Sequence, residues 1–589
     1  MKSWPQRIAL SIIALLVLLA AWVWWNRPET VDMSAYVPAE TLIYLEANSL
    51  PDIVTGLTST DAWQSLAPPA GLSPNFGRVG WLSRLSAWSG IGSAETVVFS
   101  RTQAAVAVLG FDVTDESSTV RDIKPRIALV AETHTGARRV QAAITKLVGN
   151  YARRKYGEPS IQQQDAGATT VLTWTTPDGK RKIIAAISES VAIVGNDEET
   201  VRACLAVRRG ERASLADDAQ LAEMRLRMNA NASLAFGYVS PAGARRLLET
   251  AAMIYFGQLA SDPNAQSAAA ILIPQLAGRI LGGAAWSSRI AEGAVVDNYY
   301  FNLQNELAAR LQTSLATSGE RKLRAADLLP ADTNQLTIYN YREPEAAWRG
   351  LNAAISSQLE ITIAPFVGRF LDELLVESLK PFGVDAPHDF LRAAGAEIAT
   401  VRLDDEGESL LLIASIRDRE ALQSLVRKRL GTGAKSLRVG DAEMLVAADG
   451  ERGAASFVGD YLIMGGADDV RRCLQERAAS RTLGAAGAFQ QAARFAPAND
   501  ASNVVTYTND YHPARRFISF ISRQSGARSS SSSSTPPNAA TLQRSLSALP
   551  YAFSETRLVE GGFEKTTRST FGQFGGLVVQ LATDAEADK

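Results

Sequence analysis

The alternation of apolar and polar residues predicts a strand–turn–helix unit over residues 190–210. Val191–Val194 is a short apolar run, and Gly195-Asn196 after it is typical of a turn. Asn196 or Asp197 can cap a following helix, because a short polar side chain there accepts a hydrogen bond from an unpaired backbone N–H. The expected buried stripe of that helix has helical spacing and consists of Val201, Cys204 and Leu205.

The same unit recurs much later in the chain, over residues 460–475. Tyr461–Met464 is the apolar run and Gly465-Gly466 the turn, and the stripe is Val470, Cys473 and Leu474. Further matches lie at nearly the same separation along the chain: Arg245-Arg246 with Arg515-Arg516, and Arg289–Gly293 with Arg557–Gly561. The period is far too long for a solenoid repeat. We therefore predict a duplication that produced two homologous lobes, residues 36–318 and 328–581.

Each predicted lobe opens on the same short motif. Val37–Thr41 precedes one apolar run and Leu329–Thr333 precedes another, and both motifs contain Pro-Ala, an acidic residue and Thr. Proline restricts the backbone before the first strand, and threonine can bond nearby backbone groups. The expected role of both motifs is structural.

Within each lobe the pattern favours the α+β class. Hairpin signals occur at Pro177–Gly179 and at Asp404–Gly407, and helical stretches do not alternate strictly with strands. We expect a mainly antiparallel sheet backed by helices, and a Rossmann-like alternation fits less well. Four of the expected strands in the first lobe are Thr96–Phe99, Ala104–Leu109, Ile183–Ile187 and Leu234–Val239.

An apolar, uncharged run at Ile8–Trp25 predicts a transmembrane anchor. Eighteen helical residues span about 27 Å, close to the thickness of a bilayer's hydrocarbon core. Lys2 and Arg7 precede the run, so residues 1–7 should stay in the cytoplasm and the rest of the chain outside.

The alternative interpretation of the same run is a cleaved signal peptide. Trp22, Trp24 and Trp25 stand where small residues would mark a cleavage site, which favours an uncleaved anchor.

The remaining segments are a polar spacer at 26–35, a short charged linker at 319–327 and a polar tail at 582–589. A Ser/Pro-rich loop at 529–537 lies within the second lobe and is expected to be disordered.

Composition excludes some classes of partner and site. Lys plus Arg number 60 against 62 for Asp plus Glu, and the net charge of -2 gives no electrostatic support for nucleic-acid binding. The chain has 2 cysteines, too few for a disulfide scaffold or a Cys-rich metal site. We expect Cys204 and Cys473 to be small buried residues that are too far apart to bond.

Five segments carry a resemblance to known proteins: Val37–Thr41, Phe457–Gly466, Phe382–Asp385, Asp389–Leu391 and Gly395–Ile398. They resemble a bacterial domain-of-unknown-function family of membrane-anchored cell-envelope proteins. The resemblance covers most of the chain after the anchor. It implies a bacterial cell-envelope location and supplies no activity, ligand or catalytic residue. The anchor adds the expectation of a single-pass inner-membrane protein with its bulk outside the cytoplasm.

A search for catalytic and metal-binding motifs finds none. The chain has no Walker motif, no HExxH, no G-x-S-x-G and no S-x-x-K. His134, His388 and His512 lack partners at metal-ligand spacing, although a triad of distant residues stays possible. The acidic hairpin Asp404–Glu408 could hold calcium weakly, but a solvated turn is the favoured interpretation.

These observations favour a binding or scaffold protein of the envelope without evident catalysis and without a cofactor. The alternatives are an envelope hydrolase with an active site that no motif marks, or a carrier of an apolar ligand. A residue needed once should break the repeat symmetry inside a cleft. An open, dry pocket in either lobe would favour the carrier.

The expected contact surface is a helical hairpin in the first lobe. Its outgoing helix has apolar residues at helical spacing, and its returning helix adds a second apolar face. Such faces can cover their own sheet, or they can dock an envelope protein, a lipid surface or the other lobe. The candidate contact residues are Leu247, Leu248, Ile254, Tyr255 and Leu259.

Overall fold

The computed structural model describes most of the chain after residue 29. The described ranges are 30–74, 102–115, 121–259, 278–319, 323–358, 364–449, 452–496, 502–526 and 538–576, with isolated positions between 92 and 99. The predicted anchor at 8–25 and the Ser/Pro loop at 529–537 lie outside them. Across the described ranges, no helix has the length and apolar character needed to span a bilayer.

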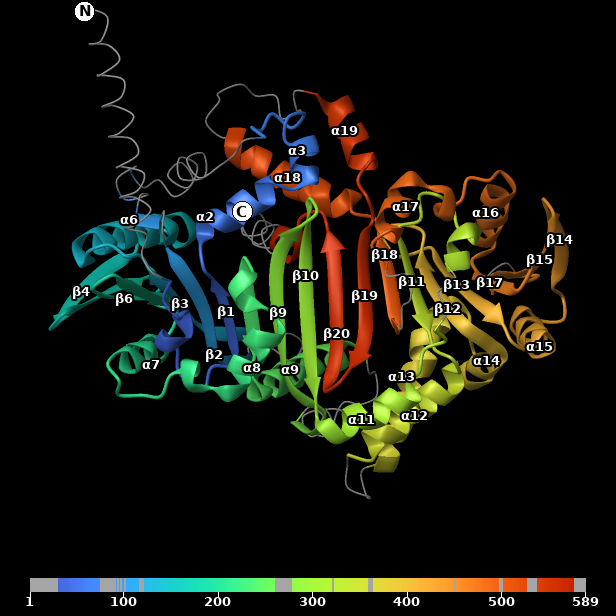
Figure 1. Ribbon diagram of the computed structural model, residues 1–589, viewed down its shortest axis with the longest axis horizontal. Coiled ribbons are helices and arrows are strands. Elements are labelled where there is room, and N and C mark those ends of the chain that lie inside the picture. The colour runs from blue at the N-terminus through green and yellow to red at the C-terminus, as the bar shows by residue number, and fades with distance from the viewer. Residues whose placement is uncertain are drawn as a thin grey trace, which may run out of the picture.

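Within the described residues, twenty strands form one continuous sheet in which every pairing is antiparallel (Figure 1). This confirms the α+β class and the antiparallel sheet. The first half contributes, in spatial order, β4 (Ser160–Ala166), β5 (Thr169–Thr175), β6 (Lys182–Ser188), β7 (Val191–Gly195), β3 (Arg121–Glu132), β2 (Gln103–Asp115), β1 (Ile43–Ala47), β8 (Ala235–Val239), β9 (Leu281–Ala291) and β10 (Ala294–Leu303).

The second half repeats this order from the opposite edge of the sheet. Its strands are β14 (Lys435–Val439), β15 (Ala442–Val446), β16 (Ala454–Val458), β17 (Tyr461–Gly465), β13 (Leu410–Ile416), β12 (Ala394–Arg402), β11 (Gln335–Asn340), β18 (Val504–Thr508), β19 (Ala552–Val559) and β20 (Gly562–Ser569). Each strand thus has a counterpart at the same place in the other half.

The two halves meet at β10 and β20, which lie side by side in the centre of the sheet (Figure 1). The register runs from Val295 opposite Ser569 to Asn302 opposite Gly562. At its middle, Asn298 faces Thr566, whose Oγ1 donates a 3.1 Å hydrogen bond to the Asn298 Oδ1. The strand order is symmetric about this pair of strands.

Helices cover the sheet on both faces. In the first half they are η1 (Met33–Tyr36), α2 (Leu50–Thr58), α3 (Asp61–Leu66), α6 (Ala137–Tyr156), α7 (Glu198–Arg208), η3 (Leu215–Asp217), α8 (Ala219–Arg227), η4 (Ala230–Ala232), α9 (Pro241–Leu259) and α11 (Asn305–Ser314). In the second half they are η5 (Leu323–Leu328), α12 (Pro344–Ser356), α13 (Ala364–Leu379), η6 (Lys380–Phe382), α14 (Pro387–Ala393), α15 (Arg419–Leu430), α16 (Ala467–Ala478), η7 (Leu483–Ala485), α17 (Gly487–Ala493), α18 (Tyr511–Gly526) and α19 (Ala539–Ser547).

The strand–turn–helix unit forms in both halves as the pattern predicts. The Asp197 carboxylate caps α7 by accepting from the Thr200 amide at 2.8 Å, whereas α16 begins after Gly466 without a side-chain cap. Cys204 and Cys473 are fully buried free thiols on the sheet-facing sides of α7 and α16. Both stripes are buried because these helices lie directly on the strands that precede them.

Strands such as β6 are almost continuously apolar because both of their faces are covered. Ile184 and Ala186 contribute to the core beneath α7 and α8, and Ala185 and Ile187 to the core beneath α6. Adjacent residues of a strand point to opposite faces. The half-sheet therefore lies between two layers of helices.

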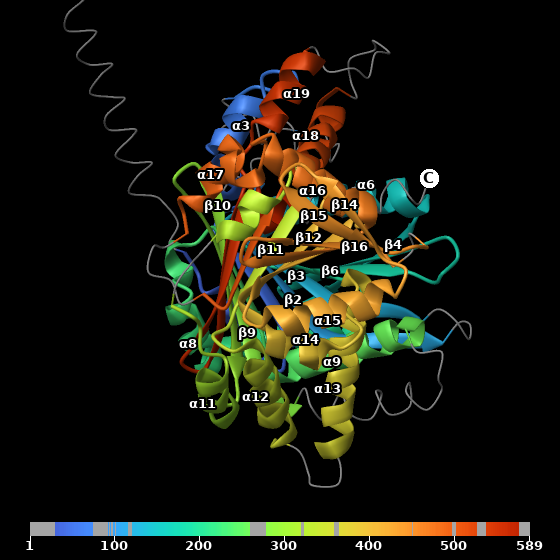
Figure 2. The same cartoon turned by 90° about the vertical axis from the view of Figure 1, so that its right-hand side faces the viewer.

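Helices from one half cover helices of the other. Trp63 and Leu66 of α3 pack with Phe517 of α18 and Leu546 of α19, at the top of the molecule (Figure 2). The Ser522 hydroxyl in α18 also donates to the Ala70 carbonyl at 3.0 Å. At the opposite end, α11 packs on α12. The second half has a helical hairpin formed by α18 and α19, and the first half's α3 covers its apolar face.

The strand predicted at Thr96–Phe99 is wrong for its second half, because Val98 and Phe99 lie in a 3₁₀ turn. Thr96 and Val97 lie outside the described residues. Val98 and Phe99 are both buried against Val140 and Ile144 of α6 rather than in the sheet. A short apolar run has no periodicity that separates a strand from a buried turn.

Candidate functional site

A functional side chain that is required in only one half should differ from the residue at the equivalent position of the other half. The helices α6 and α15 contain such a difference. These helices follow the equivalent strands β3 and β13. Val148-Gly149 in α6 corresponds to Leu430-Gly431 at the end of α15. Leu147, which packs on the first half's core, is therefore replaced by Arg429 in the second half.

A second difference lies in the strand beneath these helices. Trp174 of β5 pairs with Ile183 of β6, is 1% exposed and is the largest fully buried side chain in the described part of the chain. In the second half, Gly453 occupies the position of Ile183. The residue opposite Gly453 is Ala447, whose amide donates to the Gly453 carbonyl at 3.1 Å. Ala447 therefore stands at the position of Trp174. An indole in one half thus corresponds to a methyl group in the other.

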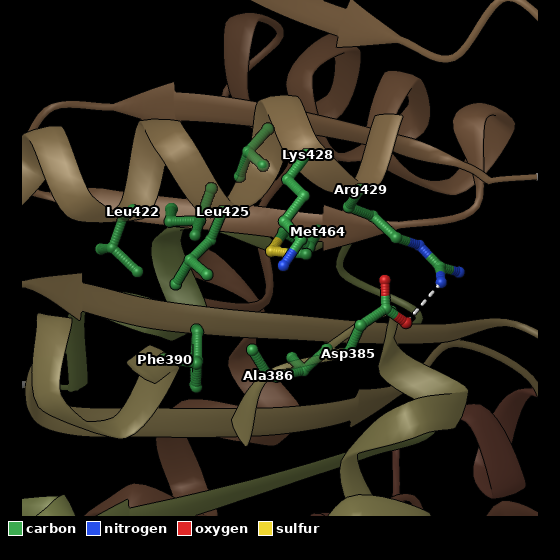
Figure 3. Close-up of a pocket in the computed structure, with 12 residues that line it drawn as sticks. Asp385, Ala386, Phe390, Leu422, Leu425, Lys428, Arg429 and Met464 are labelled. Atoms are coloured by element: carbon green, nitrogen blue, oxygen red, sulfur yellow. Dashed lines mark hydrogen bonds and ion pairs between the residues drawn. The ribbon is translucent and has the colours of Figure 1, made fainter. Parts of the chain in front are cut away.

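The second half has two adjoining hollows in this region. One is about 60 Å³ and lies between α15, α14 and β17 (Figure 3). The other is about 110 Å³ and lies towards Gly453. They share the side chains of Val426, Arg429 and Met464. We call them together the α15 pocket. The smaller hollow has a mainly apolar wall that includes Val384, Phe390, Leu422, Leu425, Leu462 and Met464, whereas the larger one is lined more by polar groups.

The polar part of the α15 pocket is cationic. The Arg429 Nη1 donates to the Asp385 Oδ1 at 2.8 Å, and the Asp385 side chain is 57% exposed (Figure 3). The Arg429 Nε is buried and has no hydrogen-bond partner in the described ranges. Lys428 and Arg452 also line the pocket, and Arg452 pairs with Asp449 at 3.2 Å. A buried donor without a partner costs roughly 1–3 kcal/mol, so an acceptor supplied by a ligand would be stabilised there.

The lining offers an apolar surface and cationic groups to a ligand. It contains no His, Cys, Ser or Thr side chain, and its carboxylate, Asp385, is already paired with Arg429. Nucleophilic catalysis needs a nucleophile next to a base. The arrangement can exclude water from an apolar group and present a guanidinium to its polar end.

The structure divides the residues of the predicted contact surface. Leu247 is half-buried and Leu248 is 38% exposed, both on α9, which packs on β9. Ile254, Tyr255 and Leu259 belong to α9, but their side chains lie outside the described part of the chain. The returning helix of this hairpin lies largely outside it as well.

The histidines make separate local contacts. The His134 Nε2 is 3.2 Å from the Gln103 Oε1, in a turn where His134 has a φ of 53°. His388 lies 3.5 Å from Asp372, and His512 lies 3.4 Å from Asp405. Among the described residues, no three His, Cys, Asp or Glu side chains converge as metal ligands.

The acidic hairpin between β12 and β13 uses its first carboxylate to hold the turn. Asp404 accepts from the Gly407 amide at 2.7 Å and from the Ser409 amide at 2.9 Å. Desolvation opposes the charge, but these backbone donors outweigh it and lower the pKa of Asp404.

Both thiols are poor nucleophiles. Burial raises the pKa of Cys204 to about 12 and that of Cys473 to about 12, because an apolar environment disfavours the thiolate.

Sequence reasoning missed the α15 pocket. A residue-by-residue alignment of the two halves would have shown the signal, because Arg429 stands at the position that Leu147 occupies in the first half.

Comparisons of the chain with protein families, with curated proteins and with solved structures found no match.

Proposed function

We propose that this protein is a membrane-anchored binding protein of the bacterial cell envelope, and that its second lobe binds a small, mostly apolar ligand in the α15 pocket. One observation carries the proposal: the wall of the pocket includes Gly453, and the residue opposite Gly453 is Ala447, where the first half has the fully buried Trp174. A duplicated fold that had kept only structural duties would have had no need to diverge here. The cavity favours the carrier-like interpretation over a scaffold alone.

The proposal includes two homologous lobes that arose by duplication. Its support is the shared strand order and the matching details at each lobe's start. The Thr41 Oγ1 donates to the Pro38 carbonyl, and the Thr333 Oγ1 donates to the Pro330 carbonyl, both at 2.7 Å. Independent origins would not be expected to reproduce such a contact before each first strand.

The proposed location rests on the apolar run at 8–25, the charges before it and the resemblance to envelope proteins. Mass spectrometry of the membrane-extracted protein should find the N-terminal segment retained. A mature N-terminus near Asn26 would instead identify a cleaved signal peptide.

The binding function is tested by filling the pocket. Full-length protein in lipid nanodiscs is incubated with 4-fluorotoluene, and amide hydrogen exchange is measured. We expect the probe to slow exchange in α15 and β17, and Ala447→Trp to abolish that effect. Ala448→Trp is the matched control, because Ala448 is exposed whereas its neighbour Ala447 is buried and lies opposite Gly453 of the pocket wall.

Each variant's thermal unfolding shows whether it is folded, and Ala447→Phe serves if the larger indole prevents folding. If the wild-type protein gains no protection from the probe, or if the filled variant gains as much, the α15 pocket is not a binding site.

A further inference from the structure

The guanidinium of Arg429 is out of place in an apolar wall, which points to the polar end of the ligand. At the equivalent position the first half has Leu147, a half-buried apolar side chain that packs against the core. Arg429 lines both hollows of the α15 pocket, and its Nε is a buried donor without a partner in the described ranges. Buried donors normally have a hydrogen-bond partner. The unpaired Nε of Arg429 is therefore consistent with a site in which the ligand supplies the acceptor.

The observed partner of Arg429 leaves much of the guanidinium unused. Asp385 accepts only from Nη1, although a guanidinium and a carboxylate can form two parallel hydrogen bonds. Asp385 is 57% exposed and follows Gly383, whose φ of 83° belongs to a left-handed turn. An exposed ion pair of this kind is weak, so another carboxylate can displace it at little cost.

The charges around the α15 pocket favour an anion. Lys428, Arg429 and Arg452 line it, against Asp385 alone among acidic residues of the lining. Asp449 pairs with Arg452 but is not part of the wall. The positive excess remains even when Asp449 is included.

The volume limits the apolar body of the ligand. The hollows of about 60 and about 110 Å³ adjoin at Met464, a flexible side chain that can adapt to an irregular shape. A dry cavity of about 150 Å³ accommodates benzene. One aryl ring or one branched alkyl group therefore fits, and a long acyl chain does not.

We infer that the α15 pocket binds a monocarboxylate with a single aryl or short branched-alkyl body, whose carboxylate pairs with Arg429 in place of Asp385. The inference rests on the proposed binding function and adds the chemical class of the ligand. The apolar body extends across both hollows against Val426 and Met464, and the carboxylate lies beside Arg429, because these three side chains line both hollows.

The test compares an acid with its neutral isostere. Phenylacetate and phenylacetamide are titrated against full-length protein in nanodiscs of uncharged lipid, with binding followed by calorimetry. We expect the wild-type protein to bind the acid at least tenfold more tightly. Arg429→Leu introduces the residue found in the first half and should remove this preference while amide binding persists. Arg427→Leu, on an exposed position of the same helix, is the matched control and should keep it.

The outcomes separate the two proposals. Equal affinity of wild-type protein for acid and amide would overturn the carboxylate inference and leave the binding function standing. No binding of either probe, together with no effect of filling the pocket, would refute the binding function itself. If Arg429→Leu fails to fold, Arg429→Gln retains a polar side chain without the charge and should also lose the preference. An unchanged preference in that variant would overturn the inference.

Discussion

Replacing Trp174 by Ala tests the packing difference on which the α15 pocket depends. Trp174 is 1% exposed and contacts the core formed with Val140, Ile144 and Val148 of α6. Truncating a buried aromatic side chain to Ala removes its transfer free energy and leaves a cavity, and such changes lower stability by about 3–5 kcal/mol. Most domains have a free energy of unfolding of about 5–15 kcal/mol, so the loss should be large.

The second half suggests how the loss can be reduced. Where it has Ala447, it also has Leu430 and Met464 in place of Val148 and Val194. Adding Val148→Leu and Val194→Met to Trp174→Ala should therefore restore roughly 1–2 kcal/mol, at about 0.8 kcal/mol per methylene group buried again. The recovery is partial because the second half itself keeps a pocket.

Urea unfolding of the full-length protein in detergent, followed by far-UV circular dichroism, measures these differences. Hydrogen exchange over β5 and β6 locates the effect. Trp174→Phe is the control, because it keeps a ring and removes an indole N–H that is buried without a partner in the described part of the chain. Its cost should be under about 1.5 kcal/mol, since removal of an unpaired donor offsets part of the lost contact. A loss below about 1 kcal/mol for Trp174→Ala, or one equal to that of Trp174→Phe, would refute the packing argument.

Three further predictions follow from buried and exposed side chains. Burial raises the pKa of both thiols to about 12, so Cys204 and Cys473 should resist alkylation from pH 8 to pH 10 and react only when the protein unfolds. Fast labelling of the folded protein at pH 8 would contradict this. Phe517→Ala should lower the free energy of unfolding by about 3–5 kcal/mol and speed hydrogen exchange in α3 of the other half, and protection of α3 that stays unchanged would argue against the shared core. Leu248→Asp should change the free energy of unfolding by less than about 0.5 kcal/mol, because Leu248 is 38% exposed, and a chemical-denaturation loss above 2 kcal/mol would assign it to the core.

The local elements and their repetition can be predicted from the sequence alone. Helix caps, turn residues and apolar spacing act over a few residues, so the pattern was sufficient for β7 with α7 and for β17 with α16, including the burial of Cys204 and Cys473. The antiparallel α+β class followed from hairpin signals in the same way. The strand predicted at Thr96–Phe99 is wrong at Val98 and Phe99 because the apolar run is too short to show a period.

The junction of the halves and the position of the pocket depend on tertiary packing. The pairing of β10 with β20 links strands far apart in sequence, and no local signal specifies which edge meets which. The burial of α18 depends on α3, which belongs to the other half. The α15 pocket depends on the sum of volumes from α15, β17 and the loop before α14, and on a position where Ala447 corresponds to Trp174. A sequence records the size of each side chain, but only packing across elements shows whether neighbours fill the space that a small one leaves.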